Sequence, residues 1–252
     1  MSSSCMTKTQ GSTSLLEETR KLLVQQGQLA EDLRDPMLMR FLTATSMDPV
    51  KATKMVMKWA KWRQEFVPLG YIPESEILDQ LDEKMAYLQG ISTSGHPVLL
   101  MKSHKHVPAK DMVRYKKGLV HMLEKTIASS FGEGGEIGDE KLIVILDLDK
   151  LSYKNVSTGE MRAGFQILQS YYPGRLEKLY ILNMPGFFVS IWKIISCFLE
   201  KAIQERISIV KTDNDRKNFI EEIGKRTLPK EYGGLAELVA LQDITLKNYP
   251  KD

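Results

Sequence analysis

Two histidines and two aspartates have a spacing that could support metal binding or catalysis. His104 and His106 alternate, so on a strand both imidazoles would face one way and could share a metal ion. No neighbouring acidic or cysteine residue completes that ligand set, which favours an exposed polar strand end. Asp147 and Asp149 follow an apolar run and could act as paired carboxylates, but aspartates also commonly end strands and cap turns. Both pairs therefore favour a structural interpretation.

Other signatures of catalysis are missing from the sequence. There is no Gly-x-Ser-x-Gly nucleophile elbow, and neither Cys5 nor Cys197 has neighbours that would activate a thiol. The glycine-rich stretch 132–136 lacks the Gly-Lys-Ser/Thr ending of a phosphate loop, and its glutamates would repel phosphate. The sequence thus predicts a protein that is not an enzyme and that uses neither a metal nor another cofactor.

Composition indicates a globular protein with a substantial core. The chain has 252 residues, of which 42% are hydrophobic and 27% are charged. A net charge of +3 provides no global field for nucleic acid, and two cysteines suit a reducing compartment. Residues 1–14 lack the apolar region of a secretion signal and begin Met-Ser, which excludes myristoylation. We expect a disordered tail there, on a cytoplasmic protein.

The next segment has the periodicity of helices. Apolar residues recur at helical spacing over 15–26, and Gly27 follows. Asp35-Pro36 and Asp48-Pro49 each combine an N-cap residue with a proline at the first helical position. The sequence predicts a small all-helical subdomain over residues 15–72.

From residue 73 onward, strand-like and helix-like segments alternate. An almost continuous apolar run, 141–148, is typical of a strand that is covered on both faces. The alternation predicts an α/β fold with a mostly parallel sheet over residues 73–234, followed by a C-terminal extension over 235–252. The expected strands are 85–91, 97–101, 141–148, 179–182 and 206–210.

The segment 179–199 is the most apolar part of the chain, with Lys193 as its single charge. A strand-like run meets an Asn-Met-Pro-Gly turn, and an apolar helix begins at Phe187 and is expected to continue to about Glu205. Because this turn interrupts the apolar run, the segment is too broken for a simple membrane span. Such a helix is either buried core or the lid of a hydrophobic ligand cavity, and we favour the lid.

Short motifs in this order resemble those of the CRAL-TRIO lipid-transfer family. They follow a helical unit that contains LMRFL and KWRQEF. The motifs are Gly95-His96-Pro97-Val98, Leu146-Asp147-Leu148, Tyr171-Tyr172-Pro173-Gly174-Arg175, Leu182-Asn183-Met184-Pro185 and Leu228-Pro229-Lys230-Glu231-Tyr232-Gly233-Gly234. The resemblance implies a sheet that floors a hydrophobic pocket for one lipid, closed by a gating helix.

From these features we predict three sets of site residues. The lipid-binding set is Leu142, Val144, Leu146, Phe165, Tyr172, Tyr180, Leu182, Phe188, Trp192, Ile195, Phe198, Ile203, Arg206 and Ile207. The gate is Phe187, Phe188, Trp192 and Phe198. The basic residues Lys193, Lys201 and Lys211 would meet anionic lipid at a membrane surface, or simply form a solvated flank.

The residues that would meet a lipid headgroup differ from those of the phosphatidylinositol-binding members of the family. Ile203 and Arg206 stand where those members have Thr and Lys, and Gly174 replaces their glutamate. Leu142 and Val144 replace a Ser/Thr pair that binds phosphocholine. The ligand is therefore phosphatidylinositol, another phospholipid, or a less polar lipid such as a sterol, isoprenoid or tocopherol-like molecule.

The resulting functional prediction is a cytoplasmic carrier that moves one lipid between membranes and contacts their surfaces transiently, without binding nucleic acid. Protein partners stay open. One alternative is a regulatory or scaffold module that presents lipid to a partner enzyme. Its docking surface would be a predicted helix over 108–130 with the basic residues Lys110, Arg114, Lys116, Lys117 and Lys125. The other alternative is an enzyme that uses Asp147, Asp149 or the histidines.

Overall fold

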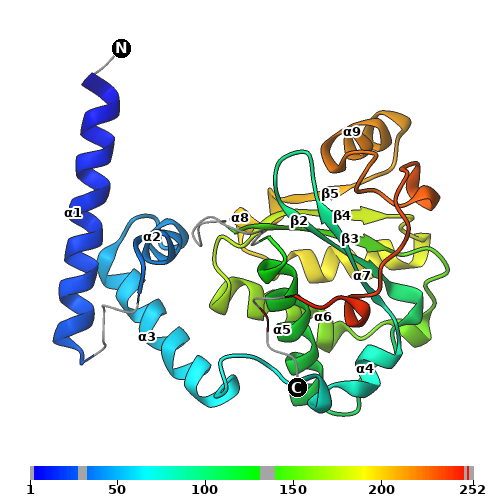
Figure 1. Cartoon of the computed structure of the whole chain (residues 1–252), viewed down its shortest axis with the longest axis horizontal. Coiled ribbons are helices and arrows are strands. Elements are labelled where there is room, and N and C mark those ends of the chain that lie inside the picture. Colours follow the sequence, from blue (N-terminus) through cyan, green and yellow to red (C-terminus); the bar gives the residue numbers. More distant parts are fainter. Residues whose placement is uncertain (1–2, 28–32, 131–139, 247–248, 250–252) are drawn as a thin grey trace. The chain divides into compact units, whose positions relative to one another are not determined.

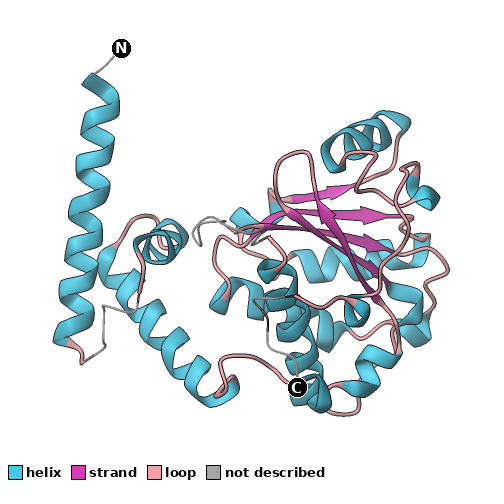
Figure 2. Cartoon of the chain, viewed as in Figure 1, coloured by secondary structure: helices cyan, strands magenta, loops and turns pink. Residues whose placement is uncertain are grey.

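The computed structural model describes residues 3–27, 33–130, 140–246 and 249 (Figures 1 and 2). The chain divides into two compact units. We call residues 1–70 together with 170–174 the helical unit, and residues 71–169 together with 175–252 the sheet unit. The glycine-rich stretch 132–136 lies outside the described residues.

The helical unit contains three helices: α1 (Ser3–Gln25), α2 (Asp35–Ala44) and α3 (Pro49–Phe66). The Asp48 side chain accepts a hydrogen bond from the Lys51 backbone N–H at 3.0 Å, which caps α3 as the sequence predicts. Apolar faces of the three helices share one core, and the returning segment 170–174 adds Tyr171, whose ring stacks on Trp62 at 4.1 Å. The core residues are Leu23, Leu33, Leu38, Phe41, Leu42, Ala52 and Val56.

The first helix begins earlier than the sequence predicts. We expected a disordered tail over 1–14, but α1 starts at Ser3. Once a helix has nucleated, each further residue adds one backbone hydrogen bond, and no proline lies upstream of Leu15 to stop that extension. The structure thus describes a helix, instead of the expected tail, from Ser3 onward.

The sheet unit is built on five strands in the order β1-β2-β3-β4-β5. The β1–β2 pair is antiparallel and the three other pairs are parallel, which confirms the predicted α/β class. Sequential parallel strands require crossover connections, and each one carries helix. The strands are β1 (Ala86–Ile91), β2 (Pro97–Lys102), β3 (Leu142–Asp147), β4 (Leu176–Leu182) and β5 (Ile207–Ile209).

Helices cover both faces of this sheet. Figure 1 shows α9 on one side and α5, α6 and α7 on the other. The helices of the unit are α4 (Leu78–Asp82), α5 (Met112–Ala128), α6 (Thr158–Tyr171, whose last two residues belong to the helical unit), α7 (Gly186–Ser196), α8 (Lys201–Gln204) and α9 (Asp213–Ile223). Short 3-10 helices are η1 (Glu74–Glu76), η2 (Ser103–Lys105), η3 (Tyr153–Asn155), η4 (Lys230–Tyr232) and η5 (Leu241–Asp243).

The face beneath α9, which we call the closed face, carries an apolar core. Strand residues Ile143, Ile145 and Tyr180 pack there against Phe219 and Ile223 of α9. The Tyr180 and Phe219 rings meet edge to face at 4.9 Å. We call the opposite face, beneath α5, α6 and α7, the cavity face.

The predicted gating helix is two helices. It was expected to run unbroken from Phe187 to about Glu205, but α7 ends at Ser196 and α8 begins at Lys201. The Gln204 amide donates back to the carbonyls of Ser196 and Leu199, which satisfies the backbone where α7 stops. None of the described helices combines the length and the apolar character that crossing a bilayer requires.

Candidate functional site

The cavity face contains a partly open cavity of about 130 Å³. Its walls are mostly apolar, and they come from the sheet and from each of the three covering helices. Leu119 and Met122 project from α5, Leu146 from β3, Met161 from α6 and Phe188 from α7. The arrangement can enclose an apolar molecule between sheet and helices.

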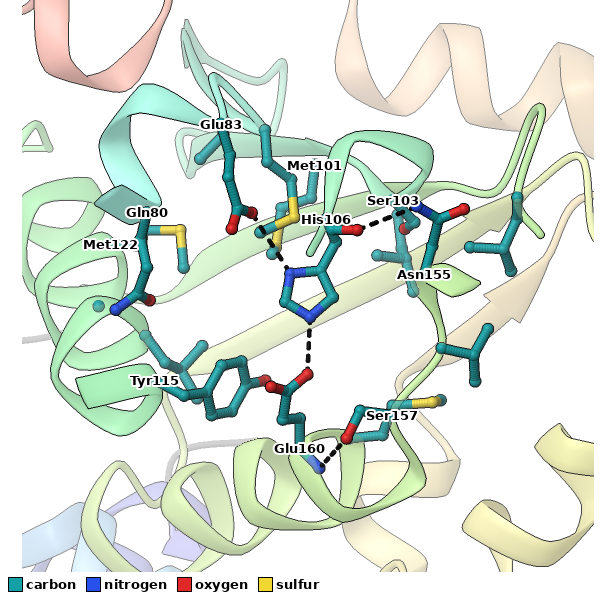
Figure 3. A pocket seen from close by; sticks show the side chains of 18 of the residues that line it. Gln80, Glu83, Met101, Ser103, His106, Tyr115, Met122, Asn155, Ser157 and Glu160 are labelled. Carbon is teal, nitrogen blue, oxygen red and sulfur yellow. Dashed lines mark hydrogen bonds and ion pairs between the residues drawn. The ribbon is translucent and has the colours of Figure 1, made fainter. Parts of the chain in front are cut away.

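One polar cluster interrupts these walls. His106 Nε2 lies 2.6 Å from Glu160 Oε2, and His106 Nδ1 lies 3.4 Å from Glu83 Oε2 (Figure 3). The Glu160 side chain is only 4% exposed. Its other oxygen, Oε1, accepts a hydrogen bond from the Ala109 backbone N–H at 2.6 Å. A carboxylate so deeply buried needs such partners, and it fixes the orientation of the imidazole.

Neighbouring backbone is tied to the same cluster. The Asn155 amide donates to the carbonyls of His104 and His106 at 3.0 Å each, which joins the segment after β2 to the segment before α6. Figure 3 shows Tyr115 extending its hydroxyl toward Glu160. The cluster therefore combines three elements that are distant in sequence.

The local electrostatics favour a charged imidazole. Burial by itself lowers the pKa of His106, but the neighbouring carboxylates of Glu83 and Glu160 outweigh it and leave that pKa above its ordinary value. Burial also raises the pKa of the Tyr115 phenol, and the charge of Glu160 raises it further. At neutral pH the cavity thus holds a neutral phenol beside a histidine biased toward its protonated form.

The two histidines do not sit as the sequence predicted. The strand ends at Lys102, and His104 falls in η2 rather than on a strand, so the alternation of side chains no longer applies. Instead, His106 faces acidic partners that are distant in sequence. No set of three or more His, Cys, Asp or Glu within the described ranges is arranged to hold a metal ion.

The structure brings together only part of the predicted lipid-binding set. Leu146 and Phe188 line the cavity. Leu142 and Val144 share the sheet face of Leu146, because side chains alternate along a strand, and both are buried outside the cavity lining. Three further residues line a shallow groove between α6 and α7: Phe165, Ile195 and Phe198.

Three other predicted residues lie elsewhere. Tyr180 and Leu182 belong to the closed face, because Tyr180 pairs in register with Ile145 and Leu182 with Asp147, one residue out of phase with Leu146. Tyr172 belongs to the helical unit, where its ring lies 6.0 Å from Trp62. Grouping Tyr180 and Leu182 with the cavity-face residues was wrong.

The predicted headgroup residues at the end of the gate are partly engaged. Arg206 forms an ion pair with Glu177 at 3.2 Å and donates to the Glu177 carbonyl at the same distance. Ile203 and Ile207 are half-buried and lie outside the cavity lining. The structure thus holds Arg206 in an ion pair within the sheet unit.

Helix α7 is apolar on its outer side as well as on its inner side. Phe188 and Ile195 are buried, whereas Ile194 is 60% exposed, and Phe198, just after the helix ends, is 51% exposed. The gate residues Phe187 and Trp192 are half-buried, and they contact the rings of Tyr153 at 4.3 Å and Phe165 at 6.2 Å, respectively. The three predicted membrane-surface residues, Lys193, Lys201 and Lys211, are exposed.

The proposed basic docking surface on α5 is largely neutralised. Arg114 pairs with Asp79 at 2.9 Å, Lys125 pairs with Glu74 at 2.8 Å, and Lys117 pairs with Glu76. Lys125 is also buried. These contacts hold the segment before β1 against α5. Of the five basic residues, only Lys110 and Lys116 form no ion pair with a described residue.

The surroundings of Asp147 indicate a structural role for its side chain. It is 5% exposed, and its oxygens accept hydrogen bonds from the Tyr232 hydroxyl at 2.6 Å, the Asn183 amide at 2.8 Å and the Asp149 N–H at 3.0 Å. Burial and the hydrogen bond to Asp147 raise the pKa of Tyr232. Three sequence motifs, around Asp147, Asn183 and Tyr232, thus meet at one carboxylate. The aspartate flagged as a possible acid or base is fully engaged in holding them together.

Sequence reasoning missed the partners of His106. Glu160 follows it by 54 residues, and Glu83 precedes it in the segment between α4 and β1. The position of Glu160 along α6 could have revealed it. Glu160 lies on the same face of the helix as the buried residues Ala163 and Ile167. A carboxylate on the apolar stripe of an amphipathic helix predicts a buried partner.

Comparison with known proteins gives a consistent result. The CRAL/TRIO domain family model matches residues 81–234. Patellin-6 of Arabidopsis thaliana is 26% identical over 220 residues, covering 82% of this chain and 52% of that protein. The Sec14 cytosolic factor of Schizosaccharomyces pombe is 26% identical over 234 residues, covering 86% and 80%. The chain therefore spans about half of one relative and most of the other.

Two further matches bear on function and fold. The phosphatidylinositol/phosphatidylcholine transfer protein SFH13 of Arabidopsis thaliana is 28% identical over 242 residues, covering 87% of this chain but only 37% of that protein. The crystal structure of Sfh5 superposes with a TM-score of 0.68 at 14% identity and covers 96% of this chain and 94% of that one. At that identity the structural likeness speaks to the fold alone.

Proposed function

This chain belongs to the CRAL/TRIO domain family, and from that premise we propose that it binds one lipid molecule in the cavity face and carries it between membranes. The observation that carries the proposal is the apolar cavity bounded by Leu146 of the sheet and Phe188 of α7. Each methylene group removed from water contributes about 0.8 kcal/mol, so an enclosed apolar cavity is the natural place for an acyl or isoprenoid chain.

Helix α7 is the lid in this proposal. Its inner residues Phe188 and Ile195 are buried, whereas its outer residue Ile194 and Phe198, two residues past its end, are exposed to solvent. Exposed apolar side chains on one helix, flanked by exposed lysines, suit contact with a membrane interface. Opening the lid against a bilayer would place the inner side chains in hydrocarbon instead of water.

Two observations support a carrier without a catalytic step. Asp147 already accepts three hydrogen bonds within the fold, and a relative is named as a phosphatidylinositol/phosphatidylcholine transfer protein. The neutralised surface of α5 offers little to the alternative in which the protein docks on a partner enzyme. Transient peripheral contact with membranes is part of the proposal.

The test is lipid movement between vesicles. Donor vesicles contain phosphatidylcholine, phosphatidylinositol, a sterol and diacylglycerol, and mass spectrometry follows which of them reaches acceptor vesicles. The double variant Ile194→Asp with Phe198→Asp should slow transfer at least about tenfold, because two large apolar groups no longer enter the interface. Both side chains are exposed, so the fold should persist.

The control is Leu235→Asp, which places the same charge on a side chain that is 67% exposed and remote from α7 in sequence. It should transfer lipid at the wild-type rate. A double variant that transfers as fast as the wild type would remove α7 from the mechanism. A wild-type protein that binds lipid but moves none would identify a lipid-regulated module instead of a carrier.

A further inference from the structure

The polar cluster of the cavity points to a class of ligand. We propose that the lipid bound there carries a free, uncharged hydroxyl group, which lies beside His106 Nδ1 and the carboxylate of Glu83 within hydrogen-bond reach of both. The inference rests on the proposed function, since it names the kind of lipid that the same cavity accepts.

His106 and Glu83 both line the cavity and form an ion pair there, but Nδ1 lacks a hydrogen bond among the described residues. Nε2 is already bonded to Glu160, whereas Nδ1 is buried and makes no hydrogen bond to any described residue. The nearest acceptor, Glu83 Oε2, is 3.4 Å away, which is long for an N–H···O bond. A hydroxyl can accept from Nδ1–H and donate to Oε2 at once, which satisfies both groups.

Charge separates a hydroxyl from other headgroups. Two carboxylates and one protonated imidazole leave a net negative charge at the cluster, and no lysine or arginine lines the cavity. A phosphate or carboxylate would meet the repulsion of Glu83 and Glu160 in surroundings of low polarity. An ammonium would meet the imidazolium at Nδ1. An alcohol avoids both conflicts.

The remaining walls suit a slender apolar body of variable shape. Four methionines line the cavity: Met85, Met101, Met122 and Met161. Their unbranched, polarisable side chains adapt to the surface they contact, so they discriminate weakly between chains. Discrimination is therefore left to the cluster of His106, Glu83 and Glu160.

The experiment uses four fluorescent probes that share one C18 polyene chain and differ at the head: cis-parinaryl alcohol, its methyl ether, cis-parinaric acid and the amine. Their fluorescence rises on leaving water, and titration of the full-length protein gives a Kd for each. The alcohol should bind roughly tenfold more tightly than the other three, because only it can complete both hydrogen bonds without an opposing charge. An acid or amine that binds as tightly as the alcohol would overturn the inference.

A variant of Glu83 tests whether this residue causes the preference for the alcohol. Glu83→Gln preserves shape and removes one carboxylate charge, so the ratio of the Kd values for acid and alcohol should fall by roughly tenfold. Glu76→Gln is the matched control, because Glu76 pairs with Lys117 outside the cavity, and it should leave that ratio unchanged. A Glu83→Gln protein with the wild-type ratio would contradict the proposed position of the hydroxyl.

The probe series also separates the two proposals. If no probe binds to the wild-type protein, the cavity does not take up lipid and the proposed function fails. If all four bind with equal affinity, lipid binding stands and the hydroxyl inference alone is wrong. These comparisons need only the wild-type protein, so they stay decisive even if a variant folds poorly.

Discussion

The two faces of the sheet differ in how their buried polar groups are paired. On the closed face, the oxygens of Asp147 accept three hydrogen bonds from within the fold. On the cavity face, His106 Nδ1 is buried and makes no hydrogen bond to a described residue. Buried polar groups in native proteins are nearly always bonded, and an exception calls for an explanation such as a ligand. Pairing on the first face is thus complete at Asp147, whereas the second face keeps a buried nitrogen without a hydrogen bond in the described part of the chain, as the proposed binding site requires.

The residues that identify the family are also different from those of the cavity cluster. Motifs around Asp147, Asn183 and Tyr232 meet at the Asp147 carboxylate, where they stabilise the fold. The cavity cluster of His106, Glu83 and Glu160 falls outside all of these motifs. If the cluster selects the ligand as proposed, recognition of the fold and of the ligand depend on different residues, and chains that share the motifs can bind different lipids.

The largest expected loss of stability comes from adding a side chain at Gly234, the last residue of the motif 228–234. A Cβ at Gly234 would lie 1.7 Å from the Leu228 carbonyl oxygen, so Gly234→Ala requires the backbone to move. We expect a loss of about 3 kcal/mol or more in the free energy of unfolding, measured with urea. The control is Gly186→Ala at the start of α7, where a Cβ meets nothing within 4 Å. Equal stability of the two variants would mean that the closing motif is not tightly packed.

A smaller but still substantial effect should follow from Asp147→Ala. This change leaves the buried Tyr232 hydroxyl without its acceptor and releases the Asn183 side chain. The expected loss is about 2–3 kcal/mol in the free energy of unfolding, seen as a shift of the urea midpoint. Asp149→Ala, at an exposed side chain, should cost little. If Asp147→Ala were as stable as Asp149→Ala, the hydrogen bonds of Asp147 would not stabilise the closed face, and the contrast between the two faces would be wrong.

The smallest effect concerns the pH dependence of the cavity face. The pKa of folded His106 is raised above its reference of 6.5 by Glu83 and Glu160, against the opposing effect of burial, so the native state holds this proton more tightly than the unfolded chain does. The stabilisation is complete below pH 6.5 and disappears as the pH rises through the elevated folded value. Urea unfolding across that window should show stability falling with pH.

His106→Gln provides the reference for that measurement, because it differs from the wild type at this side chain alone. Tyr115, the other titratable group facing His106, has a raised pKa and stays neutral throughout the window. The difference in stability between wild type and variant should shrink as the pH rises. A constant difference would show that the proton on His106 contributes nothing to folding.

Much of the architecture is predictable from the sequence because it is encoded locally. The continuous apolar run that became β3 and the Asp48-Pro49 start of α3 follow from hydrophobic pattern and capping chemistry. Helix ends are less predictable: the division between α7 and α8 depends on Gln204 reaching back to Ser196, a contact that no local pattern announces.

The site was harder to predict because it depends on register and on long-range contacts. Tyr180 and Leu182 are as apolar as their neighbours, and only the pairing of β4 with β3 assigns them to the closed face. His106 was noticed for the wrong reason, as one of an alternating pair. Its partner Glu160 comes from α6, which follows α5 and β3 in the chain, and spacing along a sequence carries no record of such an approach.

The junction between α7 and α8 has a thermodynamic consequence. Its hydrogen bonds, Gln204 to Ser196 and Leu199, lie near the surface, where water can replace each of them at a net cost of only about 1 kcal/mol. What resists the lifting of α7 is therefore chiefly the apolar contact of Phe188 and Ile195. Exposing such groups to water registers calorimetrically as a positive heat capacity change with little enthalpy near room temperature, so this joint should loosen on cooling as well as on heating.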